Sequence, residues 1–440
     1  MQGPQDTILA VEGGRPARSK QWKDNFTTSW IEGLASLKAV SSGYLSKFEG
    51  AHSAKPPFSF FGGPQVLDLE KRWASGLEIG HCVSVNSATS GLYAAIGALN
   101  VGFGDEVIVS PYTMAACATA PLVYGAIPVF ADVDPRTGCL DPASVAANVT
   151  NKTKAIIVVH QFGFPAEMDK IMAIARENSL AVIEDCAQAW QTTFQGQAVG
   201  TFGDIGVFSL NVNKAIQSGE GGLCVTRDPN LAYRMQLIRN HGEAVVGPAE
   251  YEEIENIVGF NYRMTEVTAA IAISQLAKLE RLVQKRLFLV SSFLEGVSKF
   301  DWINPLQPVC SKCNGRDSEC CRSGYYLVPF TLKPEIDRDH FVQAMLGEGV
   351  PVGAGYVRPL YFQPMFQKKV AFKANYPFAA PVNTECKQKY QEGTAPVAEH
   401  LNSNSLCTLS VLRHPHRLRD VQDLILAVRK YDSWLQKANN

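Results

Sequence analysis

Short apolar segments alternate with helix-like segments over the first half of the chain, and this alternation limits the possible folds more than any other sequence feature. The expected strands cover residues 83–86, 106–110, 128–132, 155–160 and 180–185, and two of the expected helices cover residues 87–99 and 168–178. Strands that are apolar along their whole length are typical of a parallel sheet with helices on both faces. We therefore predict an α/β architecture.

The pattern changes towards the carboxyl end. Residues 266–294 carry apolar side chains at helical spacing and predict one long helix, whereas the segments at 325–331 and 339–347 predict a strand and a helix separated by turns. We expect residues 61–290 to form a large domain and residues 291–440 a smaller α+β domain. The amino-terminal residues 1–60 lack a strong pattern and are expected to pack against the main body.

Composition excludes several classes of protein. The 440 residues are 46% hydrophobic and 19% charged, with 41 basic and 42 acidic side chains and a formal net charge of −1. A chain so nearly neutral has no extended field to attract nucleic acid or an anionic membrane. No apolar run approaches the length of a membrane span, and the first residues do not resemble a secretion signal, so we expect a cytoplasmic protein.

The eleven cysteines are mostly scattered through apolar segments, where a thiol behaves as a small hydrophobic group. The exception is the polar stretch at residues 310–323, which contains Cys310, Cys313, Cys320 and Cys321 and is expected to be a surface loop. Two pairs of thiolates could bind zinc, but the adjacent pair Cys320 and Cys321 is poorly spaced for two ligands. We therefore predict a loop insertion without a metal.

Lys214 lies in a segment typical of a tight turn, with Ser209 before it and Gly219, Gly221 and Gly222 after it. A lysine held on such a turn is the group that a Schiff base to a phosphorylated aldehyde requires. This points to pyridoxal 5'-phosphate (PLP) as the cofactor.

The other groups that PLP needs have candidates as well. Asp185 ends an expected strand, where open α/β sheets expose ligand-binding residues, and it could keep the pyridine nitrogen protonated. The turn that contains Thr89 and Ser90 begins an expected helix, whose free amides and dipole favour a phosphate. Taken singly, these residues could equally be helix caps, and Lys214 a surface charge.

The order of these residues resembles the DegT/DnrJ/StrS group of PLP-dependent sugar aminotransferases, which have the aspartate aminotransferase fold (fold type I). The resemblance runs from about Phe61 to Leu412. The motifs that carry it are SATSGL at 87–92, DEVIVSPYT at 105–113, PVFADVD at 128–134, VIEDCAQA at 182–189, FSLNVNK at 208–214, SGEGG at 218–222, RNHG at 239–242 and GFNYRMTE at 259–266.

The resemblance implies a role for each candidate. Lys214 and Asp185 are the catalytic pair, with Lys214 bonded to the cofactor and moving the proton, and Asp185 pairing with the pyridine nitrogen. Gln188 approaches the ring hydroxyl. The phosphate is expected to be held by Thr89, Ser90, Ser209 and, from the neighbouring subunit, Asn261. The resemblance therefore also implies a homodimer with a shared active site and a mostly parallel sheet of seven strands.

Some positions depart from the family pattern. Where many members place an aromatic ring over the cofactor, this chain has Met114, so stacking falls to its thioether or to Tyr112. Asn211 and Tyr361 stand where relatives often carry histidine, at positions that touch substrate. We expect His160 to be a buried, satisfied imidazole rather than a catalytic base.

The implied reaction moves an amino group from glutamate or glutamine to a keto group of a nucleotide-linked keto sugar. A cyclitol ketone or another ketone of secondary metabolism is the alternative acceptor. A PLP-dependent sugar dehydratase of the same fold would have histidine in place of Lys214, and a non-catalytic regulator would tolerate its loss. A dinucleotide-binding oxidoreductase is disfavoured because no Gly-x-Gly-x-x-Gly follows the first strand.

Overall fold

The computed structural model describes residues 8–51, 56–247, 249–310, 312, 320–386 and 388–438. Its centre is a seven-stranded sheet in the order β1-β9-β8-β5-β4-β2-β3. The strands of this sheet are β1 (His81–Val85), β2 (Glu106–Val109), β3 (Ile127–Phe130), β4 (Thr153–Val159), β5 (Ala181–Asp185), β8 (Ile205–Ser209) and β9 (Gly222–Thr226). Four of the six pairings are parallel, and only β9 runs antiparallel to its neighbours. The predicted mostly parallel sheet is confirmed.

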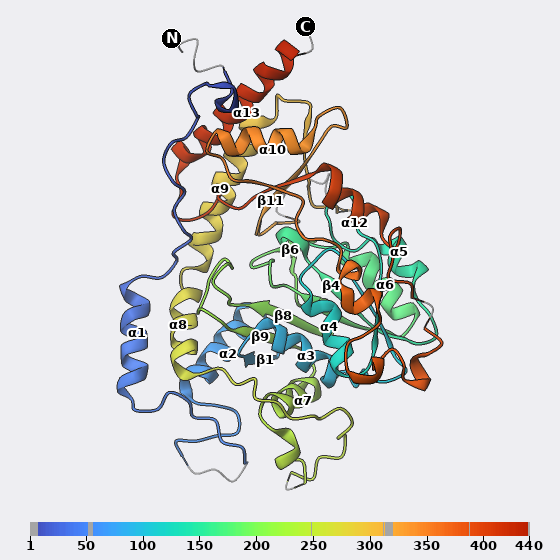
Figure 1. Ribbon diagram of the computed structural model, residues 1–440. Helices are drawn as coiled ribbons and strands as arrows, with labels where there is room; N and C mark the ends of the chain where they lie inside the picture. Colours follow the sequence, from blue (N-terminus) through green and yellow to red (C-terminus); the bar gives the residue numbers. More distant parts are fainter. Residues whose placement is uncertain are drawn as a thin grey trace.

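Both faces of this sheet are covered. Every residue of β2, β3, β8 and β9 is buried, which a strand with one face in water could not achieve. The helices of the chain are α1 (Trp30–Ser41), α2 (Pro64–Gly76), α3 (Ala88–Ala98), α4 (Ala116–Val123), α5 (Pro142–Ala147), α6 (Met168–Glu177), α7 (Pro229–Arg239), α8 (Glu266–Leu276), α9 (Leu279–Val297), α10 (Arg338–Gly347), α11 (Pro364–Gln367), α12 (Pro396–His400) and α13 (Leu418–Ala438). Helix α3 packs against β8 and β9, and α6 against β5 (Figure 1).

The prediction of one continuous helix over residues 266–294 is wrong, because the structure has two helices in this range, α8 and α9. At the break, the amide of Ala277 bonds back to Gln275 and Ile273, and the ammonium of Lys278 lies 2.6 Å from the carboxylate of Glu32. Gln275 also reaches Glu32, at 2.9 Å. These contacts come from a distant part of the chain, so the local apolar spacing could not reveal them.

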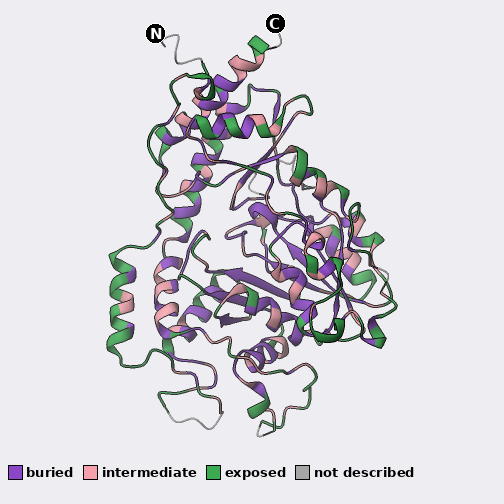
Figure 2. Cartoon of the chain, viewed as in Figure 1, coloured by how far each residue is buried: buried purple, intermediate pink, exposed green. Residues whose placement is uncertain are grey.

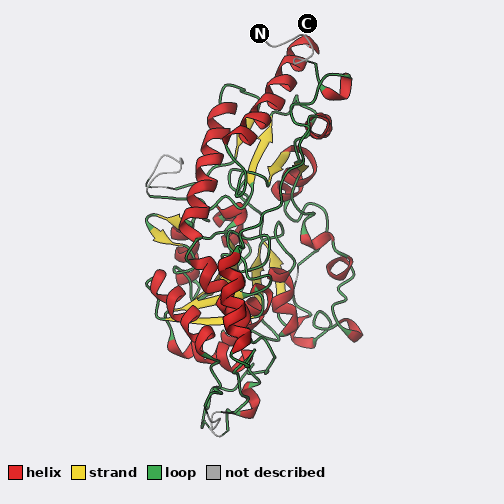
Figure 3. Ribbon diagram, turned by 90° about the vertical axis from the view of Figure 1, so that its left-hand side faces the viewer, coloured by secondary structure: helices red, strands yellow, loops and turns green. Residues whose placement is uncertain are grey.

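A second, antiparallel sheet lies towards the other end of the molecule (Figure 3). Its order is β10-β11-β13-β12, with β10 (Ile303–Pro305), β11 (Val328–Leu332), β12 (Val352–Ala354) and β13 (Leu406–Leu409), and a separate hairpin pairs β6 (Thr193–Phe194) with β7 (Gln197–Ala198). The predicted strand at 325–331 and helix at 339–347 correspond to β11 and α10. The predicted domain boundary near residue 290 falls inside α9, and the division itself stays a prediction.

The amino-terminal segment contacts both ends of the molecule. Arg18 forms ion pairs with Asp420 at 2.8 Å and Asp423 at 2.7 Å, which ties the segment to α13. Further along, α1 packs against α8, while its outward face is exposed (Figure 2). Among the described residues, no helix combines the length and apolar character that crossing a membrane requires.

Candidate active site

Lys214 lies in the loop that connects β8 to β9. The loop is closed by main-chain bonds of 2.9 Å from Leu210 to Gly221 and from Ser218 to Leu210, and the amide of Lys214 itself bonds to Asn211 at 2.9 Å. Gly219 takes φ 84°, a backbone conformation that a side chain would strain. The predicted tight turn is therefore confirmed.

The ε-amine of Lys214 is held among side chains rather than in open solvent. Its Nζ lies 4.4 Å from the centre of the Tyr326 ring, and the residue is half-buried. Burial lowers the pKa of Lys214 to about 8, a shift that Asp185 opposes and Arg413 strengthens. A useful fraction of this amine is therefore neutral near physiological pH, as a nucleophile or proton acceptor must be.

Asp185 is the last residue of β5 and is buried. Its carboxylate accepts one hydrogen bond from the amide of Ala187 at 2.9 Å and another from the thiol of Cys117 at 3.1 Å. Burial, followed by the negative charge of Asp185, raises the pKa of the Cys117 thiol, so the thiol keeps its proton and donates it. The carboxylate is thus fixed at the carboxyl end of the sheet, beside Val159 and Val207 of the neighbouring strands.

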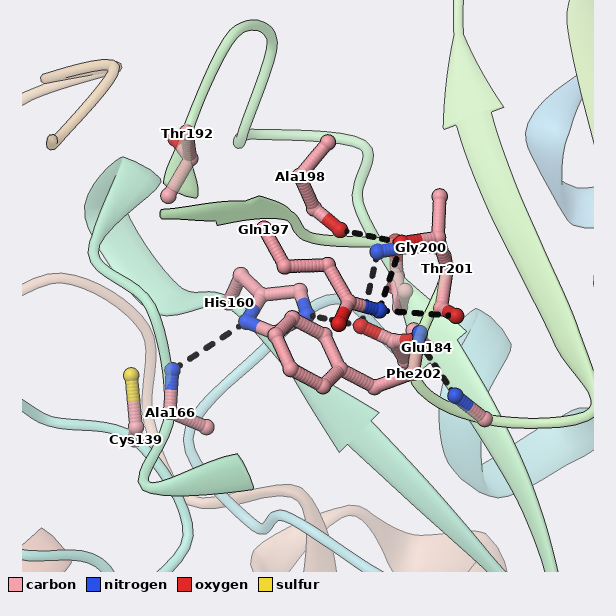
Figure 4. A network of polar contacts seen from close by, with 12 residues as sticks. Cys139, His160, Ala166, Glu184, Thr192, Gln197, Ala198, Gly200, Thr201 and Phe202 are labelled. Atoms are coloured by element: carbon pink, nitrogen blue, oxygen red, sulfur yellow. Dashed lines mark hydrogen bonds and ion pairs between the residues drawn. The ribbon is translucent and has the colours of Figure 1, made fainter. Parts of the chain in front are cut away.

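The residue before Asp185 anchors β5 on its other face. The carboxylate of Glu184 accepts bonds of 2.7 Å from the amides of Gly200, Phe202 and Gly203 and contacts Nε2 of His160 at 3.0 Å (Figure 4). Nδ1 of His160 accepts the amide of Ala166 at 3.1 Å. His160 is therefore a fully buried imidazole with both nitrogens satisfied, as predicted, and its contact with Glu184 helps to fix the strand.

Gln188 lies beside Asp185 in an aromatic environment. Its side-chain oxygen accepts the amide of Phe162 at 2.8 Å, and its side-chain nitrogen donates to the hydroxyl of Tyr356 at 3.2 Å. Tyr112 is fully buried against these rings, 6.0 Å from Tyr356 and 6.5 Å from Phe162. Met114, by contrast, is 58% exposed, which leaves its thioether available to cover a ligand. The stacking role of either residue stays a prediction.

The start of α3 is the candidate phosphate site. Ser87 caps the helix by accepting the amide of Ser90 at 3.1 Å, and the hydroxyl of Ser90 donates to Asn86 at 2.6 Å. Thr89 is exposed on the same turn, whereas Ser90 is buried, so of these two predicted phosphate ligands Thr89 has the more accessible hydroxyl.

The opposite side of this turn is formed by the β8–β9 pair. Ser209 pairs with Gly222 in register, and a Cβ on Gly222 would lie only 2.7 Å from the amide nitrogen of Ala88. Only glycine permits this approach, which brings Ser209 to the start of α3. The sheet therefore places Ser209 and the helix terminus side by side.

Asn261 is exposed, and its carbonyl oxygen accepts the side-chain amide of Asn86 at 3.3 Å. Asn261 thus lies next to the base of the phosphate turn of its own chain. Its predicted contribution to the neighbouring subunit stays a prediction.

These residues fit PLP at both of its ends. A helix amino terminus with hydroxyl groups suits the phosphate, and a buried carboxylate suits a protonated pyridine nitrogen. Lys214 offers the amine for the aldehyde of the cofactor, and the pKa of this amine is already lowered. The donor set therefore matches the cofactor that the sequence predicts.

Several residues of this site could not be found from the sequence. Tyr326, Tyr356 and Arg413 come from the carboxyl-terminal part of the chain, and the guanidinium of Arg413 donates to the carbonyl of Asn213 at 3.2 Å, next to Lys214. Cys117 lies in α4 and contacts Asp185. No motif marks these residues, because their proximity to Lys214 and Asp185 arises only when the chain folds.

Replacing Arg413 with glutamine should raise the pKa of Lys214, because a nearby positive charge that disfavours the ammonium form is removed. The rate at which the cofactor-free protein forms its visible band with PLP should rise with pH around a midpoint near 8 in the wild type. In the variant we expect this midpoint to move to higher pH. Stopped-flow absorbance across the pH range measures the shift.

The control is Arg417→Gln, a change at an exposed neighbour of Arg413, which should leave the midpoint in place. A midpoint that stays or falls in Arg413→Gln would contradict this account.

Comparison with known proteins agrees with this geometry. The aminotransferase from Psychrobacter cryohalolentis superimposes with a TM-score of 0.78 over 96% of this chain and 100% of that chain, at 27% identity. The fold is that of the fold-type I PLP-dependent aminotransferases.

The family model of the DegT/DnrJ/EryC1/StrS aminotransferases matches residues 55–388, and the chain belongs to this family. The L-glutamine:2-deoxy-scyllo-inosose aminotransferase of Streptomyces kanamyceticus is 37% identical over 63% of this chain and 64% of that protein. The GDP-perosamine synthase of Caulobacter vibrioides is 41% identical over 51% of this chain and 59% of that protein. The chain therefore matches less than two thirds of the length of these relatives.

Proposed function

We propose that this protein is a PLP-dependent aminotransferase that moves an amino group from glutamine or glutamate to the ketone of a sugar or cyclitol. The observation that carries the proposal is the amine of Lys214, half-buried over Tyr326 with its pKa lowered to about 8, with the charge of Asp185 close enough to act on it. Family membership supports the same chemistry.

The residues divide the work between binding and proton transfer. When bound, PLP supplies an electron-withdrawing ring that acidifies the carbon next to the substrate nitrogen. Asp185 would supply the negative charge that favours a protonated ring nitrogen, and Thr89, Ser90 and Ser209 would hold the phosphate. Nζ of Lys214 would take up the proton from this carbon and return it.

The dehydratase and regulator alternatives lose support because Lys214 is present, with its pKa lowered. A dehydratase of this fold would have histidine at this position, and a regulator would have no need for a half-buried amine beside Asp185. A requirement for an amino donor separates the aminotransferase from the dehydratase.

The acceptor is a polyhydroxylated cyclic ketone, either linked to a nucleotide or a cyclitol. The relatives support both classes, since one is named for an inosose and another for a GDP-linked sugar. The departures at Asn211 and Tyr361 lie at the positions predicted to touch substrate. Tyr361 is buried and its hydroxyl bonds to Glu399, so it is fixed in place.

A spectroscopic screen tests the proposed function. The protein is first loaded with pyridoxamine phosphate, and inososes and nucleotide-linked keto sugars are then added separately. We expect one of the two classes to restore the visible band of the aldehyde form, with mass spectrometry showing the aminated product. If neither glutamine nor glutamate regenerates the pyridoxamine form afterwards, the aminotransferase proposal fails even though the cofactor is bound.

We further propose that the active enzyme is a homodimer. The exposed apolar side chains on and before α1 are Phe26, Trp30, Ile31, Leu34, Leu37 and Val40. A helix surface of this character is typical of a protein interface, and α1 is exposed over most of its length (Figure 2). Light scattering should give twice the chain mass of 48.0 kDa, whereas a monomer with full activity would contradict a shared site.

A further inference from the structure

We propose that Cys310, Cys320 and Cys321 form a zinc-binding site that is separate from the active site. The sequence argues against a metal at this loop because Cys320 and Cys321 are adjacent. The fold removes this objection, because it brings the sulfur atoms of Cys310, Cys320 and Cys321 close together. Cys313 lies outside the described residues, and the proposal is based on the other three thiols alone.

Two of the three distances between the sulfur atoms match a tetrahedral zinc site. Sγ of Cys320 lies 3.7 Å from Sγ of Cys310 and 3.9 Å from Sγ of Cys321, and all three sulfurs lie within 4.8 Å of one another. Two thiolates bound to one tetrahedral zinc at about 2.3 Å are separated by about 3.8 Å. A disulfide would need about 2.05 Å. The cluster is therefore arranged for a shared metal, with one coordination position left for a further ligand.

The surroundings suit thiolate ligands. Cys310 and Cys321 are buried and Cys320 is half-buried, so a bound ion would be shielded on most sides. The amide of Gln195 donates to Sγ of Cys321 at 3.4 Å. An amide donor of this kind stabilises a negatively charged sulfur and orients it towards a metal. Zinc is the first choice because it is borderline soft and favours tetrahedral sulfur sites.

A metal at this cluster would anchor the segment that leads to the active site. The carbonyl of Cys320 accepts the amide of Gly196 at 2.7 Å, in the turn of the β6–β7 hairpin. A few residues on, the amide of Tyr326 donates to the carbonyl of Phe162 at 2.7 Å, and the Tyr326 ring lies against Lys214. Zinc would therefore hold the beginning of a segment whose end positions a ring beside the catalytic amine. Binding requires deprotonated thiols, so each coordinated sulfur releases a proton.

Metal analysis of the purified full-length protein, expressed with added zinc, tests the proposal. We expect about one zinc ion per chain in the wild type and almost none in Cys310→Ser or Cys321→Ser. Cys386→Ser, a half-buried cysteine outside the cluster, should keep its zinc. Cofactor content is measured in parallel and should persist in all variants, so that loss of metal is distinguished from failure of the proposed aminotransferase.

A second measurement avoids the variants altogether. Replacing zinc with cobalt(II) in the wild type should give the intense sulfur-to-cobalt charge-transfer bands and visible bands of a tetrahedral thiolate site. If the wild type contains no zinc and shows no such bands, or if its mass shows Cys310 and Cys320 joined in a disulfide under the same conditions, the proposal is overturned. Zinc retained in both serine variants would overturn it equally.

Discussion

Lys214→Ala should lose the visible absorbance of the bound cofactor and reduce kcat by about 10³- to 10⁴-fold, because in the proposed function both the covalent attachment and the proton transfer depend on this amine. The structure gives the reason for so large an effect. The amine is held in the β8–β9 loop beside Tyr326, with its pKa lowered to about 8. Absorbance of the purified variant and its steady-state rate with an amino donor measure the two losses.

Lys214→Arg tests whether the reactive amine of Lys214, rather than its positive charge alone, is required. Arginine keeps a cation near Tyr326 but does not lose its proton, so it can neither bond to the aldehyde nor accept a proton. We expect it to be as inactive as the alanine variant. Lys152→Ala, which removes a lysine that pairs with Glu385, should retain the band and the rate. Substantial activity in Lys214→Arg would mean that the lysine contributes only charge.

Asp185→Asn should lower kcat by about 10²- to 10³-fold, because removing a fixed charge from a buried site sacrifices electrostatic stabilisation that water cannot replace. The substitution is nearly isosteric. The side-chain oxygen can still accept the amide of Ala187, and the new side-chain nitrogen faces Cys117, whose sulfur can accept a weak hydrogen bond, so the effect reports mainly the lost charge. The pKa of Lys214 should fall as well, since Asp185 raises it.

The control for this variant is Asp204, which precedes β8 and contacts the other end of β5. Asp204 is exposed and accepts the amide of Val182 at 2.7 Å near the start of β5. Asp204→Asn should cost stability without changing the cofactor spectrum or the rate. If the kcat values of Asp185→Asn and of Asp204→Asn both stay within about threefold of the wild-type value, Asp185 does not favour the protonated ring nitrogen of the cofactor.

The strands and the order of the site residues could be predicted because they are encoded locally. The apolar run at 180–185 forms β5, and Asp185 comes at its carboxyl end because the run stops there. Likewise, α3 begins at Ala88, one residue after the start of the helix predicted for 87–99. The predicted helix at 168–178 and the observed α6 differ by a single residue.

Other features depend on contacts between distant segments and could not be predicted. The break between α8 and α9 occurs where Gln275 and Lys278 reach Glu32, more than 240 positions away. Tyr326 and Arg413 approach Lys214 only because the carboxyl-terminal part folds back over the loop. The spacing of the three thiols along the chain argues against a shared metal, yet the loop brings their sulfurs together.

The most direct test of the central claim is chemical. Reducing the wild-type holoenzyme with borohydride converts a lysine–cofactor bond into a permanent one, and peptide mass mapping then locates it. We predict a pyridoxyl group on Lys214 alone. A cofactor attached to another lysine, or a protein that takes up PLP without any covalent attachment, would contradict the account.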